Sequence, residues 1–266
     1  MSATSGNQLS SNNVISRDPD TEIVDLYMTE ELDLITLTAA LNMDDAIASV
    51  DSPSVTPIVG HMLEIKDAVG TSFYQGGILG VISTGGDGYD LDLDTPLDFP
   101  FGMSSSIMLG TREMNVDGSV TARTFLVSPE GLEAGTQWDV TRIVIHIQGT
   151  AGMDDGKFGD QAALAKGVII RAGDGFSKNI LNAKTNGEFT ERSFDREYSA
   201  FPPISKTSVV VRRTFGGVDK NGVVLRISAD TGDGVKCIVQ DDLTALDLFR
   251  ITVQGHVTDE FEQSLT

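Results

Sequence analysis

The residues of this sequence that could carry catalytic chemistry are its three histidines, its single cysteine and its many carboxylates. His61, His146 and His256 lie far apart in the chain, and no Gly-x-Ser-x-Gly turn is present to expose a nucleophilic serine. His146 lies in an alternating apolar run, which predicts a partly exposed strand position rather than a catalytic base. Cys237 lies in a similar run and is expected to be a buried, unreactive thiol. These patterns predict that the chain is not an enzyme.

The carboxylates offer a second kind of chemistry. Asp90, Asp92 and Asp94 alternate with leucines, so on a strand they would project from one face about 7 Å apart. Asp154 and Asp155 are adjacent in a glycine-flanked segment. A calcium site needs roughly six to eight converging oxygen atoms, and none of these runs has the EF-hand spacing. We therefore expect solvated acidic faces and no metal ion, with Asp154 and Asp155 as the alternative calcium ligands.

The charge and the termini limit the classes of partner. The 266 residues carry a formal net charge of -20, and residues 1–115 hold 18 acidic but only 3 basic side chains. Such acidity repels phosphates and anionic lipid surfaces, so neither nucleic acid nor a membrane is expected as a partner. The simpler interpretation is that the charge keeps the protein soluble. The functional interpretation is that a basic partner surface docks on the N-terminal half.

The sequence also lacks the usual signals for cofactors, membranes and secretion. No glycine-rich segment has the Lys-Ser/Thr pair of a phosphate-binding loop, and no cofactor is expected. No apolar run approaches the roughly 20 residues of a membrane-spanning helix. The polar N-terminus does not resemble a signal peptide, and one cysteine allows no internal disulfide. We therefore expect synthesis in a reducing cytoplasm.

The elements that would position these residues are predicted to be strands, which makes the fold all-β. Residues 1–22 are polar and are expected to form a flexible N-terminal arm. Residues 23–115 are expected to form a small antiparallel β domain, with strands near 32–38, 60–66, 73–82 and 89–94, and a helical turn allowed at 42–48. The boundary follows the charge shift and a connector-like segment at 110–118.

Residues 116–266 are expected to form a jelly-roll-like β-sandwich. About eight strand candidates recur there, separated by Asp-Gly and Asn-Gly dipeptides that favour hairpin turns. Trp138 lies in one of these strands and is interpreted as a core residue rather than a sugar-stacking platform.

Two segments of this second domain are candidates for subunit contact. Tyr198 and Phe201 precede two prolines and are expected in an exposed loop. Arg212, Arg213 and Phe215 form part of the most basic stretch, which suits an acidic neighbour such as the N-terminal half of another copy. The simpler interpretation of that stretch is a hairpin with ordinary surface charge.

Several short motifs resemble structural proteins of tailed bacteriophages, in particular virion proteins of marine phages of the tail or decoration type. The motifs are glycine-rich turns and short strand segments at residues 73–75, 93–98, 153–159, 184–189, 213–217, 219–222 and 239–244. The resemblance implies a multi-copy virion component made in the host bacterial cytoplasm, and it implies no catalytic residues. Its partners would be copies of itself and other virion proteins.

The sequence leaves three candidate functions. The first is a tail, adaptor or tail-tip protein that acts as a homo-oligomer through β-rich interfaces. The second is a capsid decoration protein of the same family, which the number of copies in each particle distinguishes from the first. The third is a carbohydrate-binding jelly-roll module, with a host-surface glycan as the ligand and Tyr198 or Trp138 as the stacking residues.

Overall fold

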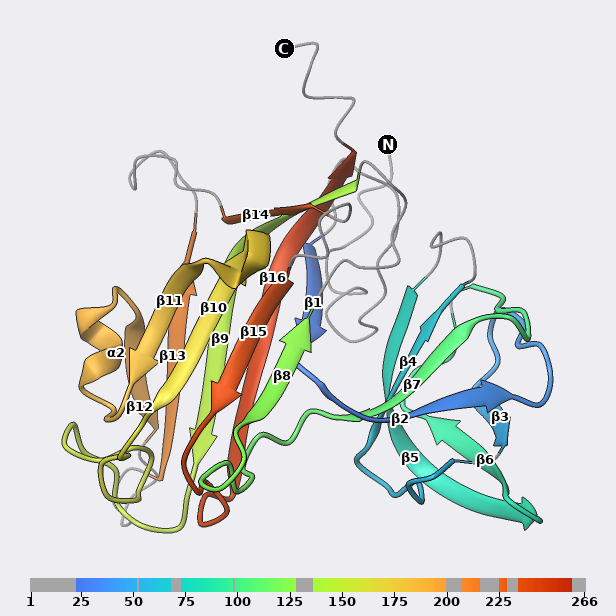
Figure 1. Ribbon diagram of the computed structural model, residues 1–266, viewed down its shortest axis with the longest axis horizontal. Helices are drawn as coiled ribbons and strands as arrows, with labels where there is room; N and C mark the ends of the chain where they lie inside the picture. The colour runs from blue at the N-terminus through green and yellow to red at the C-terminus, as the bar shows by residue number, and fades with distance from the viewer. Residues whose placement is uncertain are drawn as a thin grey trace.

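The protein is all-β and consists of a closed barrel and a two-sheet sandwich (Figure 1). The computed structural model describes residues 23–51, 53–67, 73–97, 99–127, 136–199, 207–215, 225–228 and 234–259. The segment expected to be a flexible arm, residues 1–22, lies outside them. The ladders between the named strands are antiparallel throughout the described residues, which confirms the predicted fold class. No helix in these ranges is long and apolar enough to cross a membrane.

The barrel closes in the strand order β2-β3-β6-β5-β4-β7. Its strands are β2 (Glu30–Leu37), β3 (Ile47–Asp51), β4 (Met62–Lys66), β5 (Phe73–Gly85), β6 (Gly88–Leu93) and β7 (Ser106–Thr111). The period-two pattern of β6 explains its orientation, since Leu91 and Leu93 are buried in the barrel core and Asp90 and Asp92 face outward. Closure removes both sheet edges, so a barrel this small needs no neighbour to pair its backbone.

One glycine of β5 makes room for a buried tyrosine ring. The Tyr74 side chain folds back over Gly76, where a Cβ atom would lie 1.9 Å from the tyrosine oxygen. The Tyr74 hydroxyl then donates a hydrogen bond to the Thr95 carbonyl at 2.9 Å. A residue larger than glycine at position 76 would displace this buried ring, so the glycine is required by packing.

The sandwich consists of two sheets. Strands β1 (Ile23–Tyr27), β16 (Leu248–Asp259), β9 (Thr136–Gln148), β13 (Ser208–Thr214) and β12 (Asp195–Ser199) form one sheet in that order, and β14 (Leu225–Ser228) also pairs with β9. Strands β11 (Lys178–Ala183), β10 (Val168–Gly173), β15 (Gly234–Val239) and β8 (Arg123–Val127) form the other. A 3-10 turn, η1 (Asp174–Phe176), and a short helix, α2 (Glu188–Glu191), complete the described elements.

The two sheets enclose a single apolar core. Alternate side chains from both sheets contribute to it, among them Phe125, Ile145, Ile170 and Phe249. Trp138 is 1% exposed in this core, as the sequence predicted. It packs under Gly255, where β16 shifts register and a Cβ atom would lie 2.2 Å from the indole nitrogen.

The order of the units along the chain differs from the predicted segmentation. Strand β1 pairs with β16 in the sandwich, so the expected domain at 23–115 combines one sandwich strand with the whole barrel. The barrel, residues 30–111, is therefore an insertion between β1 and β8. The allowed helical turn at 42–48 is not formed, because β3 begins at Ile47 and pairs with β6. Strand β7 was not predicted, and it overlaps the expected connector at 110–118 only in its last two residues, while β12 extends to Ser199 into the expected loop.

Candidate interaction surfaces

The histidines and the cysteine lie on separate elements. His146 is exposed on the outer face of the six-stranded sheet, in register with Val210 and Arg250. Burial and the nearby positive charge of Arg212 lower the pKa of His146. Cys237 is fully buried in the sandwich core, and burial raises the pKa of its thiol. His146 lies on the outer face of a sheet and Cys237 in the core, so these two side chains do not form a nucleophile–base pair.

The loop with Asp154 and Asp155 uses its carboxylates internally. Asp155 forms an ion pair with Arg196 at 3.0 Å and accepts a hydrogen bond from the Tyr198 hydroxyl at 2.9 Å. Burial, together with this hydrogen bond, raises the pKa of Tyr198 to about 12. Asp154 accepts the backbone N–H of Gly156 at 2.9 Å. Among the described residues, no group of three or more His, Cys, Asp or Glu side chains could hold a metal ion.

The buried Asn186 side chain holds the same loop in place by hydrogen bonds to its backbone. Its side-chain amide donates to the carbonyls of Asp154 and Gly159, both at 2.8 Å, and its oxygen accepts the Gly159 N–H at 2.8 Å. Asn186 is fully buried, so these bonds satisfy a polar group that would otherwise be costly to bury. Two glycine-containing segments, residues 153–159 and 184–189, are thereby joined into one structural unit.

The residues predicted for subunit contact have different environments. Arg212 and Tyr198 lie on neighbouring strands at the edge of the six-stranded sheet, and Arg212 pairs with Glu197 at 3.1 Å. Phe201 lies outside the described residues. Arg213 and Phe215 are not an exposed contact pair, because Phe215 is only 8% exposed and the Arg213 guanidinium stacks on its ring at 5.0 Å.

The alternation of β13 explains this correction. Arg213 follows Val209 and Val211 on the inward face of the strand, so its side chain enters the space between the sheets. There it donates to the Ile180 carbonyl of the opposite sheet at 3.0 Å. Arg213 therefore connects the two layers of the sandwich.

The large hydrophobic side chains that remain exposed are concentrated on the barrel. Of the ten among the described residues, eight belong to it: Leu34, Met43, Ile47, Ile58, Val59, Leu79, Ile82 and Met103. Singly exposed apolar residues are ordinary, so the side chains that matter for an interaction are those that lie together on one face of the barrel. This unit is also the most acidic, since residues 30–111 hold 13 acidic side chains and one basic side chain.

Three of these side chains lie on one wall of the barrel, formed by β3, β6 and β5. Ile47 is 51% exposed, Leu79 63% and Ile82 58%. Asp92 lies opposite Ile47, and Asp90 lies opposite Ile82, so carboxylates and aliphatic side chains alternate across the wall. We call the outward side chains of this wall, Ile47, Ser49, Asp51, Leu79, Ile82, Asp90 and Asp92, the distal wall.

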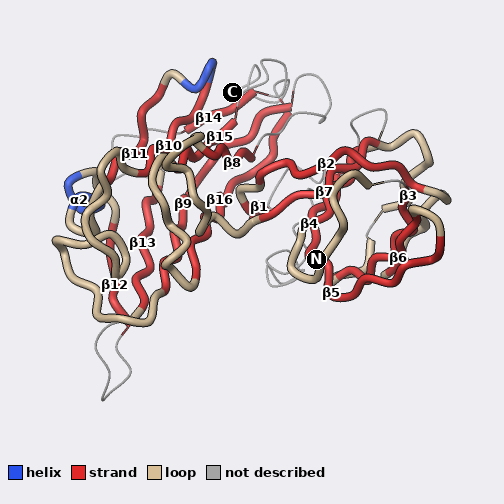
Figure 2. The backbone as a smooth tube through the Cα atoms, turned by 60° about the horizontal axis from the view of Figure 1, so that its bottom comes forward, coloured by secondary structure: helices blue, strands red, loops and turns tan. Residues whose placement is uncertain are grey.

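The distal wall faces away from the sandwich. In Figures 1 and 2, β3 and β6 lie on the side of the barrel farthest from the sandwich, and β2, β4 and β7 lie nearer to it. An open groove of about 400 Å³ adjoins the wall and is lined by residues 39–41, 44–47 and Ser49. It adds the carboxylates of Asp44 and Asp45 to the same side of the barrel.

A buried polar junction holds the barrel against the sandwich. The Gln75 side chain on β5 pairs with the backbone of Tyr27 on β1, accepting its N–H at 3.0 Å and donating to its carbonyl at 3.1 Å. Gln75 also donates to the Glu64 carboxylate at 2.8 Å, and the Thr29 hydroxyl donates to the same oxygen. Arg112 stacks over the Tyr27 ring at 4.7 Å.

The chain passes between the sandwich and the barrel twice, and both connecting segments form backbone hydrogen bonds with the sandwich. Met28 donates its N–H to the Ile251 carbonyl at 3.0 Å, and Thr29 exchanges two backbone hydrogen bonds with Leu126. On the return crossing, Met114 donates to the Phe249 carbonyl at 2.9 Å. Glu30 and Arg123 form a two-bond ion pair between β2 and β8. Two bonded crossings fix the orientation of the barrel more firmly than one flexible linker would.

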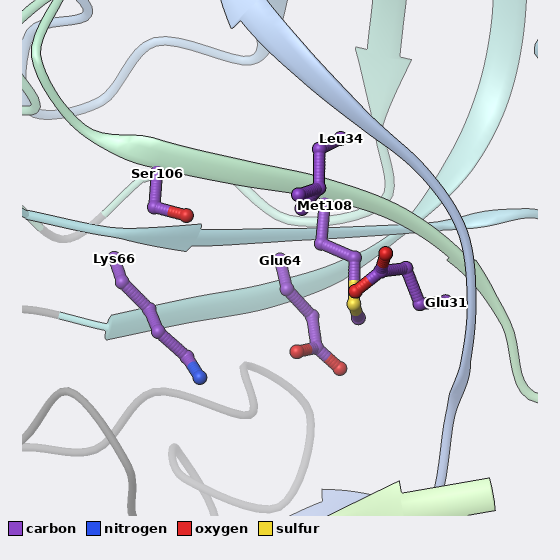
Figure 3. A pocket seen from close by; sticks show the side chains of 6 residues that line it. All are labelled: Glu31, Leu34, Glu64, Lys66, Ser106 and Met108. Carbon is purple, nitrogen blue, oxygen red and sulfur yellow. The ribbon is translucent and has the colours of Figure 1, made fainter. Parts of the chain in front are cut away.

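Glu64 links the junction to the outer surface of the barrel. Its largely buried carboxylate and the Lys66 ammonium project from the same face of β4 into a hollow of about 140 Å³ (Figure 3). Glu31, Leu34, Ser106 and Met108 complete the lining. Burial raises the pKa of Glu64, although the hydrogen bonds from Thr29 and Gln75 oppose this shift.

Comparison with known proteins adds no functional assignment. No protein-family model matches the chain, and neither the curated proteins nor the solved structures searched give a match.

Sequence patterns indicated only part of these surfaces. The Leu/Asp alternation at residues 89–94 predicted the acidic face of β6, and the structure confirms it. Ile47 and Ile82 join that face only through strand pairing, which the linear sequence does not contain. Gln75 and Glu64 gave no signal, except that each is a polar residue within an apolar strand pattern.

Proposed function

We propose that this protein is a non-enzymatic structural component of a tailed-phage virion, present in multiple copies at a tail, adaptor or tail-tip position. The observation that carries the proposal is the combination of a bonded junction with an exposed apolar and acidic distal wall. A rigid two-unit subunit can transmit the position of one contact to another. A subunit of this kind suits a repeated assembly better than a flexible pair of domains does.

The surface chemistry supports an assembly role. Ile47, Leu79 and Ile82 expose aliphatic area that water disfavours, and association with a partner would remove that area from water. The neighbouring carboxylates of Asp90 and Asp92 keep the isolated subunit soluble and orient a partner by charge. The virion setting follows from the resemblance of the glycine-rich motifs, two of which form the loop unit around Asn186.

The carbohydrate-binding alternative receives less support from the aromatic residues. Trp138 is buried in the sandwich core and offers no stacking face. Tyr198 carries the Arg196 guanidinium over its ring at 4.9 Å and donates its hydroxyl to Asp155. A sugar would have to displace both contacts to stack there.

The test is detection and counting of the protein in purified particles of the phage that encodes it. Gold-labelled antibodies against the barrel are expected to decorate the tail or its tip in electron micrographs. Quantitative mass spectrometry is expected to find roughly three to a few dozen copies per particle, as closed tail symmetry requires. Hundreds of copies on the shell would indicate capsid decoration, and absence from washed particles would contradict the virion proposal.

A further inference from the structure

The four-stranded sheet of the sandwich contains no acidic residue in any of its strands. Strands β8, β10, β11 and β15 carry Arg123, Arg171, Lys178 and Lys236 but neither aspartate nor glutamate. In a chain with a net charge of -20, this sheet is therefore a locally basic surface. It contrasts with the barrel, where 13 acidic residues accompany one lysine.

The register places basic and aliphatic side chains together on the outward face of this sheet. Arg171 lies opposite Lys236, which lies opposite Leu126, and the adjacent row is formed by Ile169, Ile238 and Thr124. The intervening residues, such as Ile170 and Cys237, are buried in the core. We call the outward set Thr124, Leu126, Ile169, Arg171, Lys236 and Ile238 the basic sheet face.

The basic sheet face and the distal wall are complementary in chemistry. Each is part of a β-sheet surface that presents three large aliphatic side chains together with charges of one sign. The charges are two basic groups, Arg171 and Lys236, on the basic sheet face, and three carboxylates, Asp51, Asp90 and Asp92, on the distal wall. Apolar contact would supply affinity, and the opposite charges would select the partner and its register.

The two surfaces cannot meet within one molecule. The distal wall lies on the far side of the barrel, whereas the four-stranded sheet lies in front of the six-stranded sheet and turns its outer face to the viewer in Figure 1. The bonded junction prevents the barrel from folding back onto that sheet. We propose that the distal wall of one copy docks on the basic sheet face of the next copy.

Such a contact is heterologous, because it joins different surfaces of identical subunits. Repetition produces a closed ring if the rotation between copies closes, and otherwise a helical filament. Both products are forms in which tail components are arranged, so the inference deepens the proposed function and rests on it. Salt is expected to weaken the contact, since the paired charges lie near the surface.

Charge reversal of each surface tests the proposal. The acid-reversed variant is Asp90→Lys with Asp92→Lys, and the base-reversed variant is Arg171→Glu with Lys236→Glu. The control is Arg142→Glu with Arg212→Glu, which reverses two exposed arginines on the outer face of the other sheet. Light scattering after size exclusion measures the mass of each protein, and circular dichroism checks that each is folded.

Wild-type protein and the control are expected to form oligomers, and each reversed variant alone is expected to have the monomer mass of 28.4 kDa. Mixing the two reversed variants in equal amounts restores opposite charges at the contact, so complexes of both variants are expected to return. The regained complex would also show that neither variant failed to fold.

Three outcomes would overturn the docking proposal. They are a wild-type monomer at every concentration up to about 1 mM, oligomers that survive either reversal, or a mixture that stays monomeric. Oligomers that survive both reversals but are lost in the Arg142/Arg212 control would move the contact to the six-stranded sheet. Labelling of virions tests the proposed function separately, so the docking mode can fail while the virion role stands.

Discussion

Replacing Gln75 with methionine removes the carboxamide that joins the barrel to the sandwich and keeps a side chain of similar size. Gln75 is 1% exposed, and its amide makes three hydrogen bonds, two to the Tyr27 backbone and one to the Glu64 carboxylate. A buried polar group left without a partner costs about 1–3 kcal/mol. Because Tyr27 is partly exposed and water can satisfy some of the lost bonds, we expect a total loss of roughly 2–4 kcal/mol.

The location of the single tryptophan makes the effect on coupling measurable. Trp138 lies in the sandwich core, so its fluorescence follows the unfolding of the sandwich, while far-UV circular dichroism follows the strands of both units. In the wild type, the two urea unfolding curves are expected to coincide. In Gln75→Met, the dichroism curve is expected to show an earlier phase, in which the barrel unfolds without a change in Trp138 fluorescence.

The matched control is Gln148→Met, because Gln148 is an exposed glutamine on β9. It is expected to change the free energy of unfolding by no more than about 0.5 kcal/mol. If Gln75→Met were equally mild, and its two curves still coincided, the junction would not be what couples the barrel to the sandwich.

Three further predictions concern single side chains. Burial raises the pKa of Glu64, so its neutral form favours folding at low pH and this contribution is lost as the pH rises through its folded pKa. Glu64→Gln should therefore gain stability relative to the wild type as the pH rises above the ordinary pKa of a glutamate in urea titrations, and a pH-independent difference would refute this reasoning. Asp241 accepts the N–H groups of residues 165–167, the shortest at 2.7 Å, so Asp241→Ala should cost about 2–3 kcal/mol in chemical unfolding. Cys237 is buried and its thiol has a raised pKa, so a thiol reagent should modify it only after denaturation. Rapid modification of the native protein would contradict its placement in the core.

The strands that the sequence predicted are those whose alternation is strong and local. The runs at 32–38, 60–66 and 89–94 correspond to β2, β4 and β6. The sequence predicts no strand at β7, because its apolar run of three residues, 107–109, is short and is bounded by serine and glycine. Strand β3 was missed because Asn42 and the two following aspartates resemble a helix start, whereas in the fold they form a turn before Ile47.

The interaction surfaces depend on strand pairing over long sequence separations. The absence of acidic residues from the four-stranded sheet becomes visible only when residues 123–127, 168–173, 178–183 and 234–239 are brought together. Arg212 and Arg213 are adjacent in the sequence, which predicts one basic contact patch. Adjacency on a strand sends neighbours to opposite faces, so Arg212 is exposed while Arg213 enters the sandwich.

The association of the wild-type chain is the property on which the account depends most. The direct measurement is its solution mass by light scattering across a concentration series at low and high salt. We expect masses that are multiples of 28.4 kDa, that rise with concentration and that fall as salt is added. A mass of 28.4 kDa at every concentration and salt level would contradict self-assembly through the barrel and the basic sheet face.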